Sequence, residues 1–153
     1  MIPEKVQKIL DAQGLRALEF EPGSTPTAEM AAARIGVQTA RIAKSLLFKD
    51  KSGGYHLVVC PGDKRLSSSL LKRIIGSKVS MTDADETERV TGYRPGGVCP
   101  FALEDVDIII DRELEQYGTI YPAAGTDATG VPLSFELLTE ITKGRVVDLA
   151  PED

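Results

Sequence analysis

The stretch that decides the fold is residues 41–60, RIAKSLLFKDKSGGYHLVVC. Two mainly apolar runs, 42–49 and 55–60, stand on either side of the polar, glycine-containing segment 50–54. This pattern predicts two strands joined by a short hairpin connection. We therefore expect the two runs to be neighbours in a sheet.

Lys44 is the unexpected residue of this stretch, because it lies in a run that otherwise resembles the start of a buried strand. Lysine is depleted in strands and is seldom fully buried without a partner. Its ammonium group is expected either to reach solvent at the strand end or to serve a functional site. Both interpretations stay open at this point.

Further helices and strands are predicted on both sides of the hairpin. Helical spacing, capping residues and terminal glycines predict helices at residues 2–13, 27–34, 66–75, 82–91 and 135–143. Short extended runs predict strands at residues 15–20, 79–81, 106–110, 118–121, 131–133 and 146–149. Because the elements do not alternate as regular strand–helix–strand units, we expect an α/β (α+β) fold with a mixed sheet and peripheral helices.

Length and composition indicate one globular domain over residues 1–153. Charged residues make up 27% of the chain, and no apolar run approaches the roughly 20 residues of a membrane span. The first residues, MIPEKVQKIL, lack the apolar core of a signal peptide. We therefore expect a cytoplasmic protein with no membrane contact.

The charge is unevenly distributed along the chain. The net charge is −5, but residues 1–100 contain 15 Lys and Arg against 11 Asp and Glu. This asymmetry permits a local basic face that contacts a few phosphates rather than a long nucleic-acid duplex. An ordinary solvated surface with an acidic C-terminal part is the alternative interpretation.

Several common sites are absent from the sequence. It contains no P-loop, no G-x-G-x-x-G fingerprint and no G-x-S-x-G elbow. His56 is the only histidine, and Cys60 and Cys99 lack the spacing of a structural zinc site. We expect no metal and no cofactor, a structural or exposed role for His56, and a packing role for Cys99 in a crowded loop.

Two glycine-containing turns offer another kind of chemistry. These are residues 96–100, GGVCP, and residues 123–127, AAGTD. Each can be a tight structural turn. Alternatively, the glycines allow a ligand to approach closely, so that backbone N–H groups bind a carbonyl or phosphate oxygen.

Four features occur in this order along the chain: Lys44 in its strand, VTGYRPGG at 90–97, the AAGTD turn and the terminal GRVVDLA. Taken together, they resemble the YbaK/prolyl-tRNA synthetase-associated domain family. Members of that family are trans-editing aminoacyl-tRNA deacylases. The resemblance implies a compact α/β fold with a mixed, partly barrel-like sheet. It also implies hydrolysis of the ester that joins a wrong amino acid to tRNA.

The resemblance also implies roles for individual residues. Lys44 would hold the terminal adenosine end of the tRNA near its phosphate or ester. The aminoacyl group would be oriented by the loop that contains Gly96 and Pro100, through backbone amides at Gly97, Val98 and Cys99. The opposite wall of the pocket would be formed by the second turn, at Ala124, Gly125, Thr126 and Asp127.

The chain departs from many relatives after both turns. Phe101 and Ala102 follow Pro100, and Asp127 with Ala128 replaces a proline–histidine pair after AAGT. We expect a free-standing deacylase for a small or polar aminoacyl group such as Ala, Ser, Thr or Cys, with an aminoacyl-tRNA synthetase as a possible partner in trans. The alternatives are a non-hydrolytic module that binds tRNA ends or nucleotides, and a synthetase-associated accessory protein.

Overall fold

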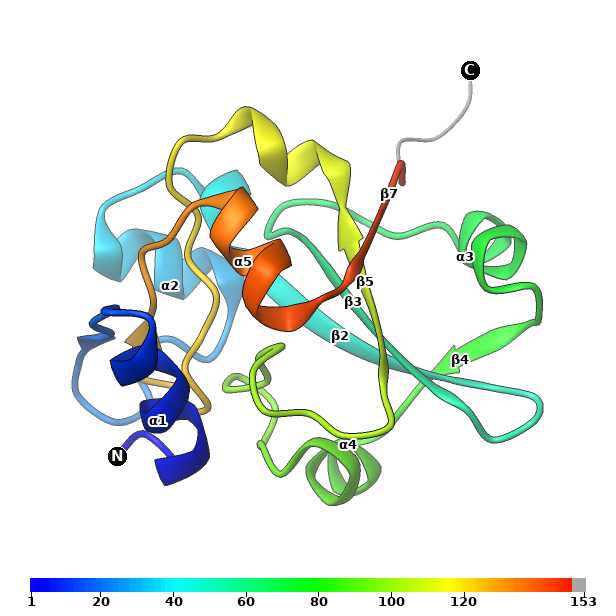
Figure 1. Cartoon of the computed structure of the whole chain (residues 1–153), viewed down its shortest axis with the longest axis horizontal. Helices are drawn as coiled ribbons and strands as arrows, with labels where there is room; N and C mark the ends of the chain where they lie inside the picture. Colours follow the sequence, from blue (N-terminus) through cyan, green and yellow to red (C-terminus); the bar gives the residue numbers. More distant parts are fainter. Residues whose placement is uncertain (150–153) are drawn as a thin grey trace.

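The predicted mixed sheet is confirmed. The computed structural model describes residues 1–149, and its main sheet has five strands in the order β4-β2-β3-β5-β7 (Figure 1). Strand β2 is antiparallel to β3 and β4, whereas β5 is parallel to β3 and β7. The strand bounds are β2 Ala43–Asp50, β3 Tyr55–Pro61, β4 Val79–Met81, β5 Asp107–Asp111 and β7 Arg145–Val147.

The predicted hairpin forms the centre of this sheet. Its register places Lys44 opposite Cys60 and Lys49 opposite Tyr55. Asp50 closes the connection, because its Oδ1 accepts hydrogen bonds of 2.9 Å from the N–H groups of both Ser52 and Gly54. A polar residue that satisfies nearby backbone donors is typical of a tight turn.

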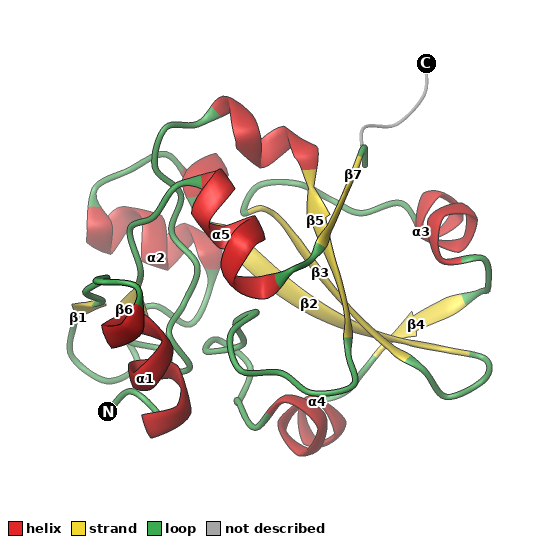
Figure 2. Cartoon of the chain, viewed as in Figure 1, coloured by secondary structure: helices red, strands yellow, loops and turns green. Residues whose placement is uncertain are grey.

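The two faces of β2 pack against different apolar clusters, because successive side chains of a strand point to opposite faces. Ala43 and Leu47 belong to the main core, which lies under α1, α5 and the loop that follows α4. Phe48 belongs to a second cluster with Leu70 and Leu71 of α3, and the half-buried Leu46 packs against that cluster. Helix α3 therefore covers the outer face of this part of the sheet (Figure 2).

All five predicted helices are present. Side-chain oxygens of Thr27, Ser67 and Ser134 each accept a hydrogen bond from the N–H group three residues further on, as N-caps do. None of the helices in residues 1–149 is long and apolar enough to cross a membrane. The helix bounds are α1 Glu4–Ala12, α2 Ala28–Ile35, α3 Ser68–Ile75, α4 Ala84–Thr91 and α5 Phe135–Thr142, with 3₁₀ turns η1 Thr39–Arg41 and η2 Arg112–Gln116.

The sequence predicts Thr82 as the cap of α4, with Asp85 three residues further on, and this prediction is wrong by one residue. Asp83, not Thr82, precedes the helix and accepts a hydrogen bond from the N–H of Glu86. The Thr82 hydroxyl instead lies 2.7 Å from that of Thr87 and contacts the Leu47 carbonyl. Thr82 thus ties the start of α4 to β2.

Three predicted strands are much shorter than expected. In the first, at 15–20, only β1 (Leu18–Glu19) is formed, paired with β6 (Thr129–Gly130). The segments 118–121 and 131–133 contribute only isolated bridges, Ile42 to Tyr121 and Ile120 to Leu133. Pro122 directly follows the first of these segments and Pro132 lies within the second. Proline has no N–H with which to continue a ladder.

His56 has the structural role that the sequence predicts. Its Nδ1 lies 2.7 Å from Asp107 and its Nε2 lies 2.7 Å from Asp50, so the ring links the hairpin turn to β5. Hydrogen bonds from His56 and from the Gly54 N–H hold the pKa of Asp50 below its usual value. Burial opposes this effect at Asp107, but hydrogen bonds from Arg145 and His56 also leave the pKa of Asp107 lowered.

Because these carboxyl groups have a lower pKa in the folded state, their stabilising contribution is present above the unfolded-state pKa of about 3.9 and is lost as pH falls below it. We expect Asp50→Asn to make the free energy of unfolding less steeply dependent on pH below about pH 5. Denaturant unfolding at a series of pH values measures this. The control is Asp63→Asn, at an exposed aspartate; equal slopes for both variants would contradict the assignment.

Candidate functional site

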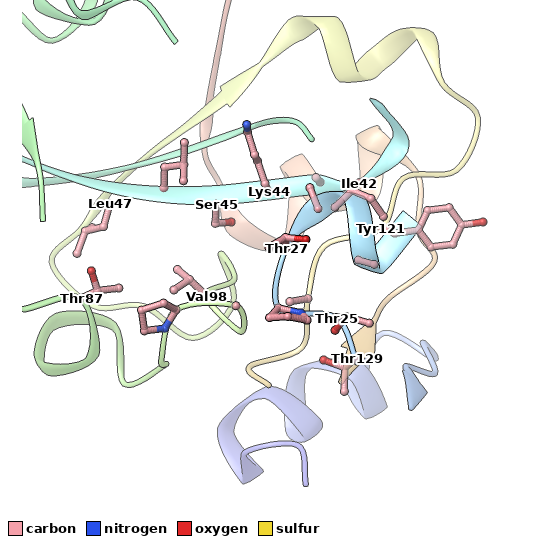
Figure 3. Close-up of a pocket in the computed structure, with 18 of the residues that line it drawn as sticks. Thr25, Thr27, Ile42, Lys44, Ser45, Leu47, Thr87, Val98, Tyr121 and Thr129 are labelled. Atoms are coloured by element: carbon pink, nitrogen blue, oxygen red, sulfur yellow. The ribbon is translucent and has the colours of Figure 1, made fainter. Parts of the chain in front are cut away.

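A cavity of about 320 Å³ lies beside β2, on the face that carries Ala43, Ser45 and Leu47. This volume is within the range of small-molecule sites. Its walls come from residues 25–35, 42–47, 81–87 and 95–98, with Tyr121, Ala123 and Thr129 completing them. Segments far apart in the sequence thus meet around one strand (Figure 3).

The edge of β2 is open where it borders this cavity, which means that no other strand of residues 1–149 pairs with it there. Strand β4 pairs only with the far end of β2, starting at Phe48, and the near end is bridged to Tyr121 through Ile42. The Ala43 N–H donates to the Tyr121 carbonyl (3.1 Å), and the Leu47 carbonyl accepts from the Thr82 N–H (3.1 Å). Since alternate residues of an antiparallel strand direct their backbone groups to the same side, those of Ser45 also face this edge. A backbone donor and a backbone acceptor therefore border the cavity.

Two buried hydroxyl groups of the cavity have no hydrogen-bond partner. Among residues 1–149, the buried side-chain oxygen or nitrogen atoms that lack a hydrogen-bond partner are Thr25 Oγ1 and Ser45 Oγ. Both residues line the cavity. Leaving a buried hydroxyl unsatisfied costs about 1–3 kcal/mol, so these atoms are poised to bind a polar group of a ligand.

Lys44 is the one charged residue among those that line the cavity. It is half-buried, and its ammonium group donates a hydrogen bond of 2.7 Å to the carbonyl of Lys64. Figure 3 shows the side chain directed away from Thr27 and Val98, toward the outer face of β2. Lys44 thus borders the cavity at the edge of β2, while its ammonium group lies on the opposite face of the strand.

The first glycine turn lies at the cavity, but only some of its residues line the cavity wall. Gly96 and Val98 line the wall, whereas Gly97 does not. Gly96 has a φ of +93°, in the left-handed region that favours glycine. The Gly97 N–H donates to the Arg94 carbonyl (2.9 Å), so this predicted ligand-binding amide is already used within the turn.

Cys99 and Pro100 lie behind the cavity wall. Both are buried, and neither is among the residues that line the cavity. Burial raises the pKa of the Cys99 thiol to about 11, which keeps it protonated at neutral pH. The packing role predicted for Cys99 agrees with this position, and its side chain does not reach the cavity.

The second glycine turn supports the site from behind. Ala124, Gly125, Thr126 and Asp127 are not among the residues that line the cavity, although the flanking Ala123 and Thr129 are. Asp127 accepts a hydrogen bond from the Gly23 N–H (3.0 Å) at its side chain and another from the Thr25 N–H (2.7 Å) at its carbonyl. The turn thereby holds residues 23–25 against the cavity.

The two turns touch each other through their backbones. A Cβ atom added at Gly97 would lie 2.7 Å from the Thr126 nitrogen and 2.8 Å from the Gly125 carbonyl carbon. Gly125 itself has a φ of +92° and faces Pro3 and Tyr93. The sequence predicts both turns as parts of one site, and the structure brings them into contact.

One whole wall of the cavity is not predicted from the sequence. Thr25, Pro26, Thr27, Ala28 and Ala31 line it, from α2 and the loop before it. Thr27 signals a helix start, but no local pattern indicates that this helix lies beside β2. Ser45 carries no functional signal in the sequence either, although it is the neighbour of Lys44.

Among residues 1–149, no group of three or more His, Cys, Asp and Glu side chains is arranged to hold a metal ion.

The chain belongs to the aminoacyl-tRNA editing domain family, whose sequence profile matches residues 22–141. Editing by such a domain is hydrolysis of the aminoacyl ester of tRNA, so the predicted family and class of enzyme are confirmed. The mixed α/β fold agrees with that family.

Individual relatives and solved structures agree with this family. Over 129 residues the chain is 36% identical to the uncharacterized protein YwhH of Bacillus subtilis, covering 84% of this chain and 82% of that protein. It is 27% identical over 129 residues to EbsC of Enterococcus faecalis, whose name proposes a Cys-tRNA(Pro)/Cys-tRNA(Cys) deacylase, with 83% and 79% covered. A crystal structure described as a proposed trans-editing enzyme for prolyl-tRNA synthetase superposes with a TM-score of 0.87 at 29% identity, covering 97% of this chain and 96% of that one.

The close contact between the two glycine turns leads to a prediction about Gly97. We expect Gly97→Ala to lower the free energy of unfolding by about 1–3 kcal/mol, because its Cβ atom would displace the Gly125–Thr126 backbone. Denaturant unfolding measures this effect.

The control is Gly118→Ala, where an added Cβ atom meets nothing within 4 Å. We expect this variant to change stability by less than about 1 kcal/mol. An equal effect of the two substitutions would show that the turn contact does not constrain residue 97.

Proposed function

We propose that the protein is an aminoacyl-tRNA deacylase acting in trans, which hydrolyses the ester of mischarged tRNA. The cavity would hold the aminoacyl group, and the ester would lie at the open edge of β2. The observation that carries the proposal is that one cation, Lys44, borders a cavity in an editing-domain fold whose lining contains no other charged residue.

The chemistry needs little from the protein. An aminoacyl ester is an activated acyl compound, so a positioned water and electrostatic stabilisation of the oxyanion suffice without a covalent nucleophile. The Ser45 N–H faces the edge where the ester carbonyl would lie, and the Ser45 carbonyl can accept from the α-ammonium group of the substrate. Lys44 supplies positive charge beside the ester and the terminal nucleotide.

We further propose that the aminoacyl group is small or polar, such as Ala, Ser, Thr or Cys. The unpartnered hydroxyls of Thr25 and Ser45 support a polar group, because a substrate hydroxyl or thiol would satisfy them. The name of EbsC, which proposes a Cys-tRNA deacylase, points to the same chemistry in a relative. The partners would be the acceptor end of tRNA and an aminoacyl-tRNA synthetase in trans, in the cytoplasm.

The decisive experiment is deacylation of a panel of tRNAs charged with different amino acids. We expect hydrolysis of one or more small or polar aminoacyl esters at micromolar enzyme. Tight binding of charged and uncharged tRNA without turnover would instead favour a non-hydrolytic binding module. An absence of both hydrolysis and binding would contradict the proposal.

Lys44→Ala tests the assigned cation. We expect kcat/KM to fall by about 100-fold or more, because the substitution removes the one charged side chain among the residues that line the cavity. The matched control is Lys49→Ala in the same strand, where the ammonium group pairs with Glu86 (3.3 Å) outside the cavity. Full activity in Lys44→Ala, or an equal loss of kcat/KM in both variants, would contradict the proposed role of Lys44.

The unpartnered hydroxyls are tested by the ratio of two substrates. We expect Ser45→Ala and Thr25→Val each to reduce the preference for seryl-tRNA over alanyl-tRNA by about tenfold, the value of one hydrogen bond of about 1.4 kcal/mol. Rates with both tRNAs, measured on each variant, give the ratio. Ser77→Ala, outside the cavity, is the control; an unchanged ratio in all three variants would contradict recognition by these hydroxyls.

A further inference from the structure

Three polar side chains stand in one row across the main sheet. Lys44 of β2 lies opposite Cys60 of β3 in the hairpin register. Strands β3 and β5 are parallel, with Val59 beside Ile110, so the residues that follow them, Cys60 and Asp111, are also side by side. Lys44 and Asp111 are therefore two strands apart, and Cys60 lies between them.

The three side chains point to the same face of the sheet. Val58 and Ile109, two residues earlier in β3 and β5, belong to the second apolar cluster on the outer face. Side chains two residues apart in a strand share a face, so Cys60 and Asp111 point outward, as Lys44 does (Figure 3). Neighbouring strands are about 4.8 Å apart, which puts the backbones of Lys44 and Asp111 roughly 10 Å from each other. The flexible four-carbon stem of lysine lets its ammonium group reach a carboxylate across the small Cys60.

Asp111 is nevertheless bound by another lysine. The Lys64 ammonium group lies 2.6 Å from Asp111 and 3.4 Å from Glu113. The Asp111 side chain is 1% exposed and that of Lys64 is 10% exposed, so little water screens this pair. Burial disfavours the charged form of Lys64, but the hydrogen bond to Asp111 and its charge outweigh burial and raise the pKa of Lys64. Lys64 therefore stays protonated and neutralises the buried carboxylate.

Lys44 has a different kind of partner. Its ammonium group donates a hydrogen bond of 2.7 Å to the backbone carbonyl of Lys64, and no carboxylate in residues 1–149 lies within ion-pair distance of it. A carbonyl is uncharged, so this contact orients the ammonium group without neutralising it. Lys64 thus holds Lys44 with its carbonyl and occupies the neighbouring carboxylate with its side chain.

The charges of this row act on the buried Cys60 thiol. Burial raises the pKa of Cys60 to about 12. The positive charges of Lys44 and Lys64 oppose this increase, whereas the negative charge of Asp111 adds to it. The two cations and the carboxylate therefore lie around one side chain, close enough for either lysine to pair with Asp111.

We propose that Lys64 is a positioning residue whose side chain keeps Asp111 from pairing with Lys44 and so leaves the Lys44 charge available to the substrate. The inference rests on the proposed function, in which Lys44 supplies positive charge beside the ester. Without the Lys64 charge, Asp111 would be a buried carboxylate with no cation, which is strongly unfavourable. Lys44 is the next cation in the row, so it would leave the Lys64 carbonyl and pair with Asp111.

Lys64→Gln tests the charge, because glutamine keeps a hydrogen-bond donor for Asp111 but is neutral. We expect kcat/KM for aminoacyl-tRNA to fall by about tenfold, as when Lys44 is correctly placed in only about one molecule in ten. Lys64→Arg keeps the charge and should retain most of the activity. The matched control is Lys49→Gln, which breaks the ion pair with Glu86 away from the row and should leave kcat/KM unchanged.

A second substitution distinguishes this role from a purely structural ion pair. Adding Asp111→Asn to Lys64→Gln removes the competing carboxylate, so we expect most of the lost activity to return. Asp111→Asn alone should lower kcat/KM much less than Lys64→Gln, whereas a purely structural pair would suffer equally from both. Full activity in Lys64→Gln, no recovery in the double variant, or a large loss in Asp111→Asn would each overturn the proposal. The last of these outcomes is measurable even if Lys64→Gln does not fold.

The position of Lys44 provides a measurement that does not depend on deacylation. In a crystal structure of Lys64→Gln, we expect the Lys44 ammonium nitrogen within about 4 Å of an Asp111 carboxylate oxygen, the distance of an ion pair. In the double variant, we expect it at the carbonyl of residue 64 again. An ammonium group that stays at this carbonyl in Lys64→Gln would overturn the proposal. A wild-type protein that does not deacylate would contradict the proposed function, while the position of Lys44 would still decide whether Lys64 separates it from Asp111.

Discussion

Strand β2 is packed on both faces but is unpaired along part of one edge, and the site depends on this constraint. Backbone N–H and C=O groups need hydrogen-bond partners, so an uncovered edge inside a fold is normally closed by another strand. Here β4 covers the edge from Phe48 onward and Tyr121 covers its other end. The gap between them exposes Ser45 to a cavity and leaves polar groups available to a ligand.

The position of the charge follows from the same strand. Side-chain alternation separates Lys44 from Ser45, although they are neighbours in sequence. The Lys44 ammonium group, held by the Lys64 carbonyl, serves the outer face, while the Ser45 hydroxyl serves the cavity on the inner face. One strand can therefore present a cation and uncharged hydrogen-bonding groups to two different parts of one substrate. Such a division suits an aminoacyl ester, which joins a nucleotide to an amino acid.

The two glycine turns act mainly by fixing the walls of the cavity. Gly97 approaches the backbone of Thr126 so closely that any side chain would separate the two segments. Asp127, which departs from the proline–histidine pair of many relatives, holds residues 23–25 and lies outside the cavity lining. Its hydrogen bonds therefore connect it to the cavity through the loop that carries Thr25. The small-residue turns thus shape the walls of a cavity to whose lining they contribute few atoms.

The sequence by itself determined the hairpin, the five helices and the editing family, because each depends on local spacing, caps or an ordered set of motifs. It also predicts Lys44 and the two turns as parts of a common site, which stays a prediction. Only the tertiary structure decided which elements cover each face of β2, because that depends on pairing between segments far apart in the chain. For this reason the wall from α2, the unpartnered hydroxyls of Thr25 and Ser45 and the outward direction of Lys44 were not predictable from local patterns. The lysine that stands out in the sequence lies at the unpaired edge of β2, whose position depends on β4 and Tyr121 and is not encoded by any single segment of the chain.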